Sequence, residues 1–582
     1  MRHHALALLV VGLAVGLAAA WPVASAACPD GASTVVAVQG TGSRSPLLGR
    51  PAQVRGVVTA VFPRAFPGAG DLGGFFLQDG DGAAAGDGSG SSGLFVRLPR
   101  HAAAPRPGDV VWVDGTVAES DQMTQLVAVT RLERCGAATV PPPREVRLPV
   151  PNPARWEALE GMRVHLAGPL TVTGVYELGR TGELTLADAR LFTPTQGAGT
   201  ATPTGARRIV LDDGSRRQDP RPVPYLLPDG RPPRVGDRVS DVTAVVVQAG
   251  AGDYLLEPTA APTLHAANAR PSAPRPVAGE VRVATFNVHN FFTTLGERGA
   301  RSRAQLRLQR AKLAAALAGL DADAIALQEV ENDGMRSVDA LLAALNARLG
   351  SDAYAAVPDP RGGVGGDRIR QAVLYRRARL ELVATASDPR PIFERAPVAA
   401  TFRTVAGDTF TLVDVHLKSK GGCPAAGDVD RGYGCWNLRR SAQAQAVLAF
   451  ADRLAQQAGD PDVLVAGDLN SYAGEPPLRL FADAGYASAD RLVPAARRYS
   501  YVFRGLSGTL DYLLASPSLA PKLAGATIWH IDADESPLAG AFAMGGEAAY
   551  VRPDAFRASD HDPVIVGLRG TSKGSSASAR GR

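Results

Sequence analysis

Cysteine is scarce in this chain: four occur among 582 residues, at positions 28, 135, 423 and 435. No two of them have the C-x-x-C spacing, which argues against a structural zinc site. An even number of cysteines in an exported chain indicates disulfides. Three pairings are open. We favour Cys28–Cys135, around the first strand-rich region, and Cys423–Cys435, which would close a glycine-rich loop.

Histidine and lysine are also rare, and long apolar runs are missing beyond the N-terminus. None of the nine histidines forms an H-x-x-x-H pair, which excludes the zinc-protease pattern. The net charge of +5 favours a polyanion ligand, although it comes almost wholly from arginine, a bias that genomic base composition also produces. No run after residue 26 reaches the roughly 18 apolar residues that a membrane span needs.

The first 26 residues have the pattern of a secretory signal peptide. Arg2 supplies the positive charge, residues 5–20 the apolar segment, and the small residues up to Ala26 a cleavage site. We therefore predict a secreted or periplasmic protein and leave residues 1–26 out of the fold. Cys28 would also suit a lipoprotein signal, but Ser25 stands where that signal has a branched apolar residue.

Residues 27–140 consist of short strand-like runs separated by turns, which predicts a small OB-like barrel. Such barrels bind nucleic-acid strands through aromatic side chains. The four aromatic residues that could do so here are equally suited to the core. They are Phe75, Phe76, Phe95 and Trp112.

Residues 144–266 are again rich in strand-like runs. The phrase around Gly108-Asp109 is repeated at Gly236-Asp237, which hints at a second barrel of the same kind. Residues 267–279 have the composition of a linker. The tail 571–582 reads as disordered.

From residue 280 to 570, strands alternate with helices, which predicts a layered α/β domain. The pattern indicates helices at 303–320 and near 437–458. In this domain, residues capable of catalysis follow or end apolar runs in six separate segments. They are Asn287, Glu329, His416, Asp468 with Asn470, Asp511, and Asp560 with His561.

One such residue would mean little, because buried strands commonly end in a turn-forming Asp or Asn. A set drawn from six segments indicates a site, because strand ends converge in a layered α/β scaffold. Asn287, Glu329 and Asp560 are hard oxygen ligands suited to Mg²⁺. For phosphodiester hydrolysis, Asp468 could accept a proton from water while Asn470 fixes its position.

The blocks "TFNVHNFF", "LQEVEN", "VDVHLKSKGG", "VAGDLNSY", "GTLDYLLAS" and "ASDHDPV" occur in this order. In this they resemble the endonuclease/exonuclease/phosphatase family, which includes pancreatic-type deoxyribonucleases and apurinic-site endonucleases. The OB-like region in front makes the chain similar to the bacterial extracellular nucleases of that family. The resemblance implies a four-layered α/β sandwich for residues 280–570, with its site at one edge of two packed sheets.

The same resemblance implies a role for each site residue. Asn287 and Glu329 would bind the divalent ion, with Asp560 beside them. His561, with Asp511 fixing its ring, would face the scissile phosphate. His416 would lie near the leaving group, oriented by Asp367.

Five basic residues near these blocks are candidate phosphate contacts, since Lys and Arg beside a phosphodiester site position the backbone without reading bases. They are Arg368, Lys418, Lys420, Arg439 and Arg440. The sequence thus predicts a secreted Mg²⁺-dependent endonuclease, with Mn²⁺ or Ca²⁺ as alternatives, that acts as a monomer on DNA rather than RNA. The alternatives are a phosphatase or phospholipid phosphodiesterase on the same scaffold, or a surface-adhesion or polyanion-binding protein with a vestigial domain.

Overall fold

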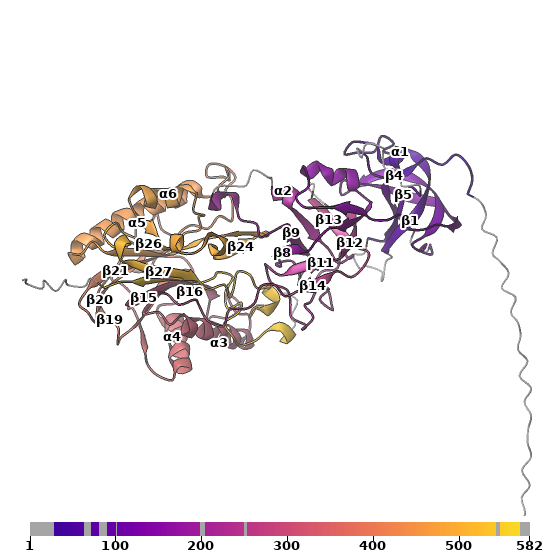
Figure 1. The fold of residues 1–582 in the computed structure, drawn as a ribbon. Coiled ribbons are helices and arrows are strands. Elements are labelled where there is room, and N and C mark those ends of the chain that lie inside the picture. The colour runs from indigo at the N-terminus through magenta and orange to yellow at the C-terminus, as the bar shows by residue number, and fades with distance from the viewer. Residues whose placement is uncertain are drawn as a thin grey trace, which may run out of the picture.

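Three bodies follow one another along the molecule (Figure 1). The computed structural model describes residues 28–62, 72–80, 90–99, 102–197, 204–249, 253–542 and 548–570. The predicted signal peptide and the predicted tail lie outside these ranges. Within the described ranges, no helix is long and apolar enough to cross a membrane.

The first body is a closed barrel with the strand order β1-β2-β3-β5-β4. Its strands are β1 (Pro51–Phe62), β2 (Gly74–Gln78), β3 (Gly93–Arg97), β4 (Asp109–Ser120) and β5 (Met123–Ala137), and helix α1 (Val35–Gln39) precedes them. The prediction of a small barrel is confirmed, and its assignment to the OB type stays an interpretation. Phe75, Phe76, Phe95 and Trp112 are at most 2% exposed, so these four rings belong to the interior.

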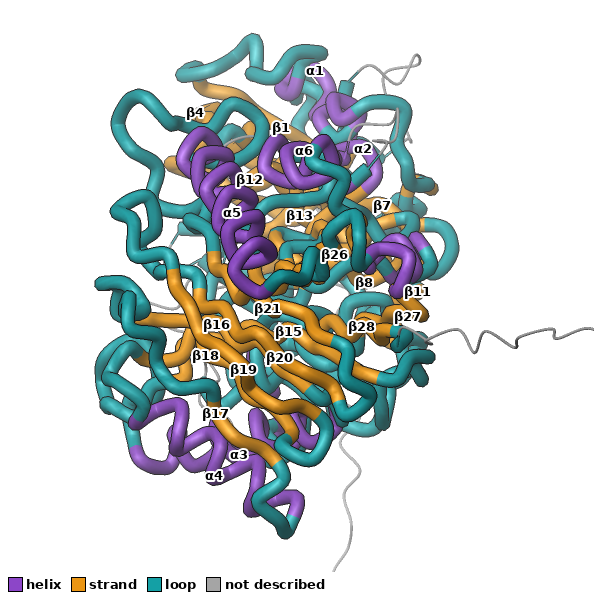
Figure 2. The backbone as a smooth tube through the Cα atoms, turned by 90° about the vertical axis from the view of Figure 1, so that its left-hand side faces the viewer, coloured by secondary structure: helices purple, strands orange, loops and turns teal. Residues whose placement is uncertain are grey.

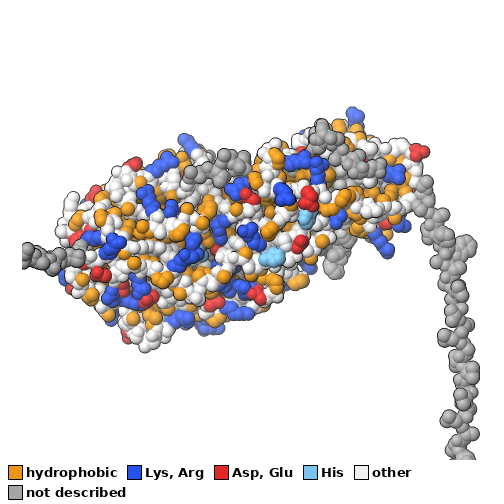
Figure 3. Space-filling view, in the orientation of Figure 1, with side chains coloured by type: hydrophobic (Ala, Val, Ile, Leu, Met, Phe, Trp, Pro, Cys, Tyr) orange, Lys and Arg blue, Asp and Glu red, His pale blue; other side chains and the backbone are white. Residues whose placement is uncertain are grey.

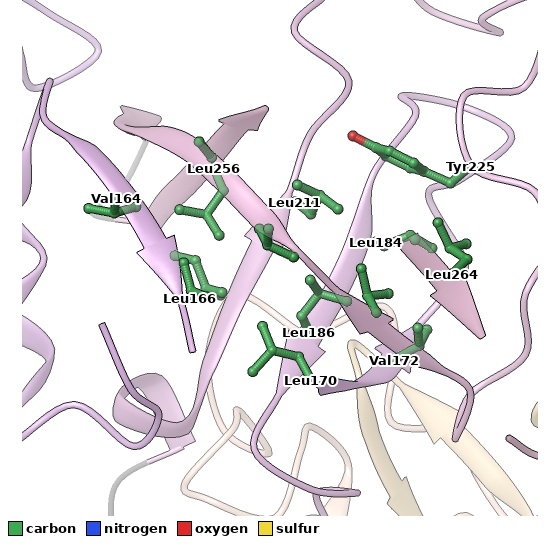
Figure 4. Packing of buried hydrophobic residues seen from close by; sticks show 14 of the residues in the cluster. Val164, Leu166, Leu170, Val172, Leu184, Leu186, Leu211, Tyr225, Leu256 and Leu264 are labelled. Carbon is green, nitrogen blue, oxygen red and sulfur yellow. The ribbon is translucent and has the colours of Figure 1, made fainter. Parts of the chain in front are cut away.

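The second body is one nine-stranded sheet with the order β14-β11-β8-β9-β10-β13-β12-β7-β6. Its strands are β6 (Arg144–Val146), β7 (Arg163–Leu166), β8 (Leu170–Gly174), β9 (Leu184–Ala187), β10 (Arg208–Leu211), β11 (Arg238–Ser240), β12 (Val242–Ala249), β13 (Asp253–Pro258) and β14 (Thr263–His265), and helix α2 (Thr204–Arg207) precedes β10. Aliphatic side chains such as Leu184, Leu186 and Leu256 fill its core (Figure 4). We call this body the middle module.

The repeated Gly-Asp phrase therefore does not mark a second closed barrel. It encodes the same turn twice. Asp109 accepts a hydrogen bond from the backbone N–H of Arg106 at 2.8 Å, and Asp237 accepts one from Arg234 at 2.8 Å. The turn starts β4 in one body and precedes β11 in the other, but a local turn does not decide whether a sheet closes.

The third body has two six-stranded sheets. One has the order β17-β18-β16-β15-β28-β27, and the other β19-β20-β21-β22-β26-β23. The first holds β15 (Val281–Phe291), β16 (Ala324–Glu331), β17 (Tyr354–Ala356), β18 (Ile369–Arg376), β27 (Leu523–Ile528) and β28 (Val564–Leu568). The second holds β19 (Leu380–Ser387), β20 (Val398–Thr404), β21 (Thr409–His416), β22 (Val463–Asp468), β23 (Ala487–Ser488) and β26 (Asp511–Ala515).

Apolar side chains of both sheets form one shared core, so the sheets pack face to face. Helices α3 (Arg303–Leu320) and α4 (Arg336–Leu349) cover the outer face of the first sheet. Helices α5 (Asn437–Ala458) and α6 (Pro476–Asp483) cover the second. Figures 1 and 2 show the helices on the two outer sides with the strands between them. This arrangement confirms the predicted four-layered α/β sandwich and both predicted helices.

Both favoured disulfides are present. Cys28 is bonded to Cys135, and Cys423 to Cys435. The first joins the segment before the barrel to β5. The second closes the loop between β21 and α5.

Candidate active site

Three of the predicted residues lie side by side because of strand register. His416 ends β21 and is paired with Asp468 at the end of β22, which in turn is paired with Asp511 at the start of β26. The pairing of β21 with β22 requires glycine at position 467, since a Cβ atom there would lie 1.9 Å from the carbonyl oxygen of Val415. Glycine in the G-D-x-N block thus lets β22 run beside β21.

The first sheet supplies the remaining residues at the same edge. Asn287 lies in β15 and Glu329 in β16, two parallel strands. Both strands shift register at this point, β15 after Asn287 and β16 after Leu327. Such bulges turn side chains away from the regular alternation. They explain how Glu329 comes to point into the site.

Backbone strain is concentrated here. Glu329 has φ +65°, Asn470 +48°, and His289 and Asn290 +50° and +51°. A side chain in this left-handed region costs roughly 1–3 kcal/mol and persists where the surrounding structure holds it. The neighbouring contacts do so: the backbone N–H of Asn290 donates to Glu329 Oε2 at 2.9 Å, and that of Asn470 to Asp468 Oδ1 at 2.8 Å.

His561 is part of a buried chain of polar groups. Its Nδ1 donates to Asp511 Oδ2 at 2.9 Å, and its Nε2 lies 3.9 Å from Asp468 Oδ2. Burial opposes the charged imidazolium, but Asp511 and Asp468 outweigh burial and raise the pKa of His561 well above its ordinary value. Burial raises the pKa of Asp468 to about 7, with His561 acting in the opposite direction. The site therefore pairs a cationic histidine with a carboxylate that titrates near neutrality.

His416 differs from the prediction in what holds it. Its Nε2 lies 3.4 Å from Asp468 Oδ2, and its Nδ1 has no hydrogen-bond partner. Asp367, expected to orient this ring, instead faces Arg395 at 3.6 Å. Arg395 donates to the backbone carbonyls of His416 and of the next residue, so Asp367 acts at most on the backbone. Burial, with Arg395 adding to it, lowers the pKa of His416 well below its ordinary value, which makes it a neutral histidine.

The predicted metal ligands fit a hard divalent cation. Nδ2 of Asn287 lies 3.1 Å from both Glu329 Oε1 and Asp468 Oδ2 and so joins the two carboxylates. Asp560 follows Ser559, whose hydroxyl donates to the carbonyl of Asn287 at 2.7 Å. Burial opposes its ionisation, yet His289, His561 and Arg557 hold the pKa of Asp560 at about 2. Ionised carboxylates and an amide are the ligands that Mg²⁺ prefers.

A second group could also hold a metal. Within the described ranges, Asp468, Asp511 and His561 have donor atoms that all lie within 4.8 Å of one another. However, the Nδ1 of His561 is already committed to Asp511, so only its Nε2 is free to bind an ion. We therefore interpret these three residues as the proton-handling part of the site and the Asn287 group as its cation-binding part.

The predicted phosphate contacts divide into two groups. Arg440 is fully buried and donates to the carbonyls of Cys435 at 2.6 Å and Tyr433 at 2.9 Å, so it supports the disulfide loop and does not contact substrate. Lys420 is likewise engaged by Glu475 and by the carbonyl of Tyr433. Arg440 thus lies inside the protein, because local sequence does not show which side of α5 is buried. Lys420 lies in the loop after β21 and is partly exposed, so its assignment as a phosphate contact stays a prediction.

The other three basic residues are reachable from solvent. Arg368 is exposed and pairs with Glu297. Arg439 pairs with Glu394 at 3.1 Å. The Nζ of Lys418 lies 5.3 Å from the Trp436 ring centroid. They stay candidates for contact with a phosphate backbone.

The burial of Arg440 gives a stability prediction. Replacing Arg440 with methionine leaves several backbone carbonyls buried without a donor, so the free energy of unfolding should fall by about 2–4 kcal/mol. Urea unfolding measures this change. Methionine at the neighbouring Arg439, which is one-third exposed, is the control and should change stability by less than about 0.5 kcal/mol. Equal effects of the two substitutions would contradict the assignment.

Some site residues were not found from sequence. The ring of Tyr501 lies 4.6 Å from that of His561, and the Ser500 hydroxyl donates to Asp511 Oδ2 at 2.6 Å. Tyr501 begins β24 (Tyr501–Phe503), which forms a hairpin with β25 (Leu506–Gly508), and Ser500 directly precedes it. Nothing in the segment "RYSYVF" distinguishes it from an ordinary strand. The only sequence feature that points to a site role for this segment is its closeness in the chain to Asp511.

Comparison with known proteins gives one family match. Residues 284–561 match the family model "Endonuclease/Exonuclease/phosphatase family". No curated protein matches the chain.

Several solved structures are similar over about half of the chain. The human Nocturnin catalytic domain with bound sulfate is 18% identical over 50% of this chain and 96% of its own, with a TM-score of 0.34. The Bacteroides thetaiotaomicron mannosyl-6-phosphatase is 14% identical over 50% and 99%, with a TM-score of 0.34. D. rerio TDP2 complexed with a single-strand DNA product is 16% identical over 49% and 97%, with a TM-score of 0.32.

The family match covers the segments that carry all of the converging residues, from Asn287 in β15 to His561 before β28. Residues 284–561, just under half of the chain, therefore match the Endonuclease/Exonuclease/phosphatase family model over the whole candidate site.

Proposed function

We propose that this protein is a secreted, divalent-metal-dependent nuclease that cleaves DNA with little sequence specificity. The observation that carries the proposal is the row His416, Asp468 and Asp511 across three neighbouring strands, with His561 bonded to Asp511. This row brings the proposed base, Asp468, next to the charged His561. The proposed cation ligands, Asn287, Glu329 and Asp560, lie at the same edge of the sheets. Secretion rests on the signal-peptide pattern of residues 1–26.

In the proposed reaction, Asp468 accepts a proton from the attacking water. Its pKa of about 7 suits a general base at neutral pH. Asn470 helps to position that water, and its own amide is held by the carbonyl of Leu417 at 3.1 Å. A divalent cation bound by Asn287, Glu329 and Asp560 would neutralise charge on the phosphate.

The two histidines have different tasks. His561 is cationic and faces the site between Asp511 and Asp468, so it stabilises negative charge developing on the phosphate oxygens. His416 is neutral and uses its Nε2 next to Asp468. A neutral imidazole there can donate a hydrogen bond toward the departing oxygen without repelling a cation.

A nucleic-acid substrate is favoured by the surroundings of the site. The cavity of about 300 Å³ that includes Glu280, Arg379 and Lys522 lies at the opposite ends of the same strands, away from the catalytic edge. Lys418 follows His416 by two residues, and Arg368 directly precedes β18, whose Ile369 is paired with Glu331 of β16. Lys and Arg are scattered over the visible face (Figure 3). Scattered positive charge suits a backbone ligand read without sequence specificity.

Phospholipid phosphodiesterase activity is the second candidate. Such an enzyme is expected to insert an exposed aromatic hairpin into the membrane, and the β24–β25 hairpin carries Phe503, which is 53% exposed. The hairpin is anchored to the middle module, however, since Arg208 donates to the carbonyl of Arg504 at 2.7 Å. A single anchored ring offers little area for a bilayer.

Incubation of supercoiled plasmid, linear DNA and RNA with the protein, with and without EDTA, tests the proposal. We expect nicking and degradation of both DNA forms in Mg²⁺ and none with EDTA. Hydrolysis of choline phospholipid vesicles but not DNA would favour the second candidate. A protein that hydrolyses no phosphodiester in Mg²⁺, Mn²⁺ or Ca²⁺ would contradict both.

The pH dependence follows from Asp468. Burial raises its pKa to about 7, so below that pH the base is increasingly protonated and loses its function. We expect kcat/KM to fall roughly tenfold per pH unit on the acid side of this value. Because a cation near Asp468 favours its ionised form, the pH at which activity falls to half on the acid side should decrease as the Mg²⁺ concentration increases. Rates that rise toward pH 5 would exclude Asp468 as the base.

A further inference from the structure

Residues 530–535, which lie beside the catalytic edge, are held from two sides, by residues 557–562 of the sandwich and by the middle module with the predicted linker. The carboxylate of Asp534 is fully buried and accepts hydrogen bonds from Arg190 at 2.9 and 3.2 Å. It also accepts one from Asn268 at 2.7 Å. Arg234 donates to the carbonyl of His530 at 2.9 Å. Arg190, Arg234 and Asn268 all belong to the N-terminal half of the chain or to its predicted linker.

The predicted linker, residues 267–279, is thus part of an interface. Besides Asn268, Arg270 pairs with the buried Glu535 at 2.6 Å. The indole of Trp529 donates to the carbonyl of Pro271 at 3.2 Å. These contacts fix the middle module against the sandwich, and Figure 1 shows the two bodies adjoining at β24 and β9.

A continuous set of contacts leads from Arg190 to the catalytic histidine. The guanidinium of Arg190 lies 4.3 Å from the Tyr499 ring centroid. The Tyr499 ring is stacked on His530, with centroids 4.0 Å apart and 7° between planes, and its hydroxyl donates to Asp534 at 2.9 Å. His530 Nδ1 bonds to Asp562 at 2.9 Å, and Asp562 directly follows His561.

Tyr499 also begins the segment that touches the catalytic pair. The hydroxyl of the next residue, Ser500, donates to Asp511 Oδ2 at 2.6 Å. The backbone carbonyl of Ser500 accepts a hydrogen bond from the backbone N–H of Asp562 at 2.8 Å. Tyr501 then packs on the ring of His561. Tyr499, Ser500 and Tyr501 therefore connect the middle module to the Asp511 carboxylate and the His561 ring.

We propose that the middle module is a structural part of the catalytic unit and that Arg190 is a positioning residue for the His561–Asp511 pair. The expected effect on kcat rests on the proposed function. The expected effect on the order of residues 499–503 and 530–535 does not depend on it. The partner surface is the 530–535 segment together with Tyr499. Arg190 acts on catalysis through these groups and does not touch the substrate.

The physical reason is the buried charge of Asp534. When Arg190 is removed, a fully buried carboxylate keeps only neutral donors from Asn268 and Tyr499. Arg234 and His530 still attract the carboxylate electrostatically, but its direct ion pair is lost. Breaking a buried ion pair is strongly unfavourable, so the segment should shift to hydrate the charge. Tyr499 loses the Arg190 guanidinium that lies over its ring. Its hydroxyl also loses a fixed acceptor when the Asp534 carboxylate moves. Ser500 and Tyr501 then no longer hold the catalytic pair in one geometry.

The test compares Arg190→Ala with Arg207→Ala in the full-length protein. Arg207 pairs with Asp188 inside the middle module, and its side chain is 17% exposed, the same as that of Arg190. We expect Arg190→Ala to lower kcat on plasmid DNA roughly 10- to 100-fold, with KM within about threefold, because misplaced groups act on the reacting step. Arg207→Ala should leave both constants within about twofold. Arg190→Lys should restore part of kcat, since lysine keeps the charge but not the bidentate geometry.

Amide hydrogen exchange provides a readout that does not depend on activity. In Arg190→Ala, protection should fall in residues 499–503 and 530–535 but not in β7 and β8, whereas Arg207→Ala should leave 499–503 unchanged. If the native protein cleaves DNA and Arg190→Ala keeps native kcat and exchange, the inference is overturned and the proposed function stands. If the native protein hydrolyses nothing, the proposed function fails, and the exchange pattern alone decides whether Arg190 positions the segment.

Discussion

Replacing Asp468 with asparagine should reduce kcat on plasmid DNA by a factor on the order of 10²–10⁴, the contribution of a positioned general base. Asparagine has nearly the same shape, so the contact with Asn287 at 3.1 Å need not be lost to packing. It cannot accept the proton of the attacking water. His561→Ala should have an effect of similar size because it removes the cationic group beside the phosphate.

The control for this experiment lies at the other end of the same strand. Asp462 immediately precedes β22, is buried and pairs with Lys522, far from the catalytic edge. Asp462→Asn should lower stability but leave kcat within about threefold, measured well below the unfolding transition. If Asp468→Asn and His561→Ala both retain native activity, the catalytic assignment is wrong.

Removal of the divalent cation should reduce hydrolysis to the uncatalysed background, and adding Mg²⁺ should restore it. The residues proposed to bind the ion supply carboxylate and amide oxygens. Glu329→Gln weakens one ligand, so the Mg²⁺ concentration for half-maximal activity should rise roughly 10- to 100-fold. Titration of Mg²⁺ and of Mn²⁺ after dialysis against EDTA measures this shift.

Glu331 offers a matched control two residues further along β16. Its carboxylate is buried and accepts hydrogen bonds from the backbone N–H groups of Thr293 at 2.8 Å and Thr294 at 3.0 Å. Glu331→Gln should therefore reduce stability without moving the midpoint of the Mg²⁺ titration. A shift of equal size in both variants would assign the metal effect to general distortion of the strand.

Local patterns were enough where one strand or helix determined the outcome. The apolar spacing from Arg303 to Leu320 predicted helix α3 with its observed bounds. The short strand-like runs within residues 27–140 predicted the strand-rich barrel that β1–β5 form. Each pattern reports a periodicity that the chain must satisfy whatever its neighbours are.

The residues of the site were also visible in sequence, but their relations were not. His416, Asp468 and Asp511 come together through the pairing of β21, β22 and β26, which are far apart along the chain. Tyr501 and Ser500 reach His561 and Asp511 only through the fold of a hairpin. Cross-strand register depends on long-range pairing, which a single strand does not specify.

Burial decided where sequence reasoning failed. Arg440 has the charge of a phosphate contact, yet it is fully buried and donates to the carbonyls of Cys435 and Tyr433. Asp367 has a partner in Arg395 and not in His416. The composition of residues 267–279 predicts a linker, but Asn268 donates a hydrogen bond to the buried Asp534 and Arg270 pairs with the buried Glu535.

The sequence by itself predicted the layered α/β class, the strand-rich N-terminal half and the favoured disulfide pairing, and it supplied most of the candidate residues for the catalytic edge. Only the tertiary structure decided which residue holds which other, that His416 stays neutral, and that the middle module supports the catalytic pair. The reason is physical: periodicity and motif are properties of a local segment, whereas burial, pKa and the neutralisation of a buried charge depend on groups that the folded chain brings from hundreds of residues away.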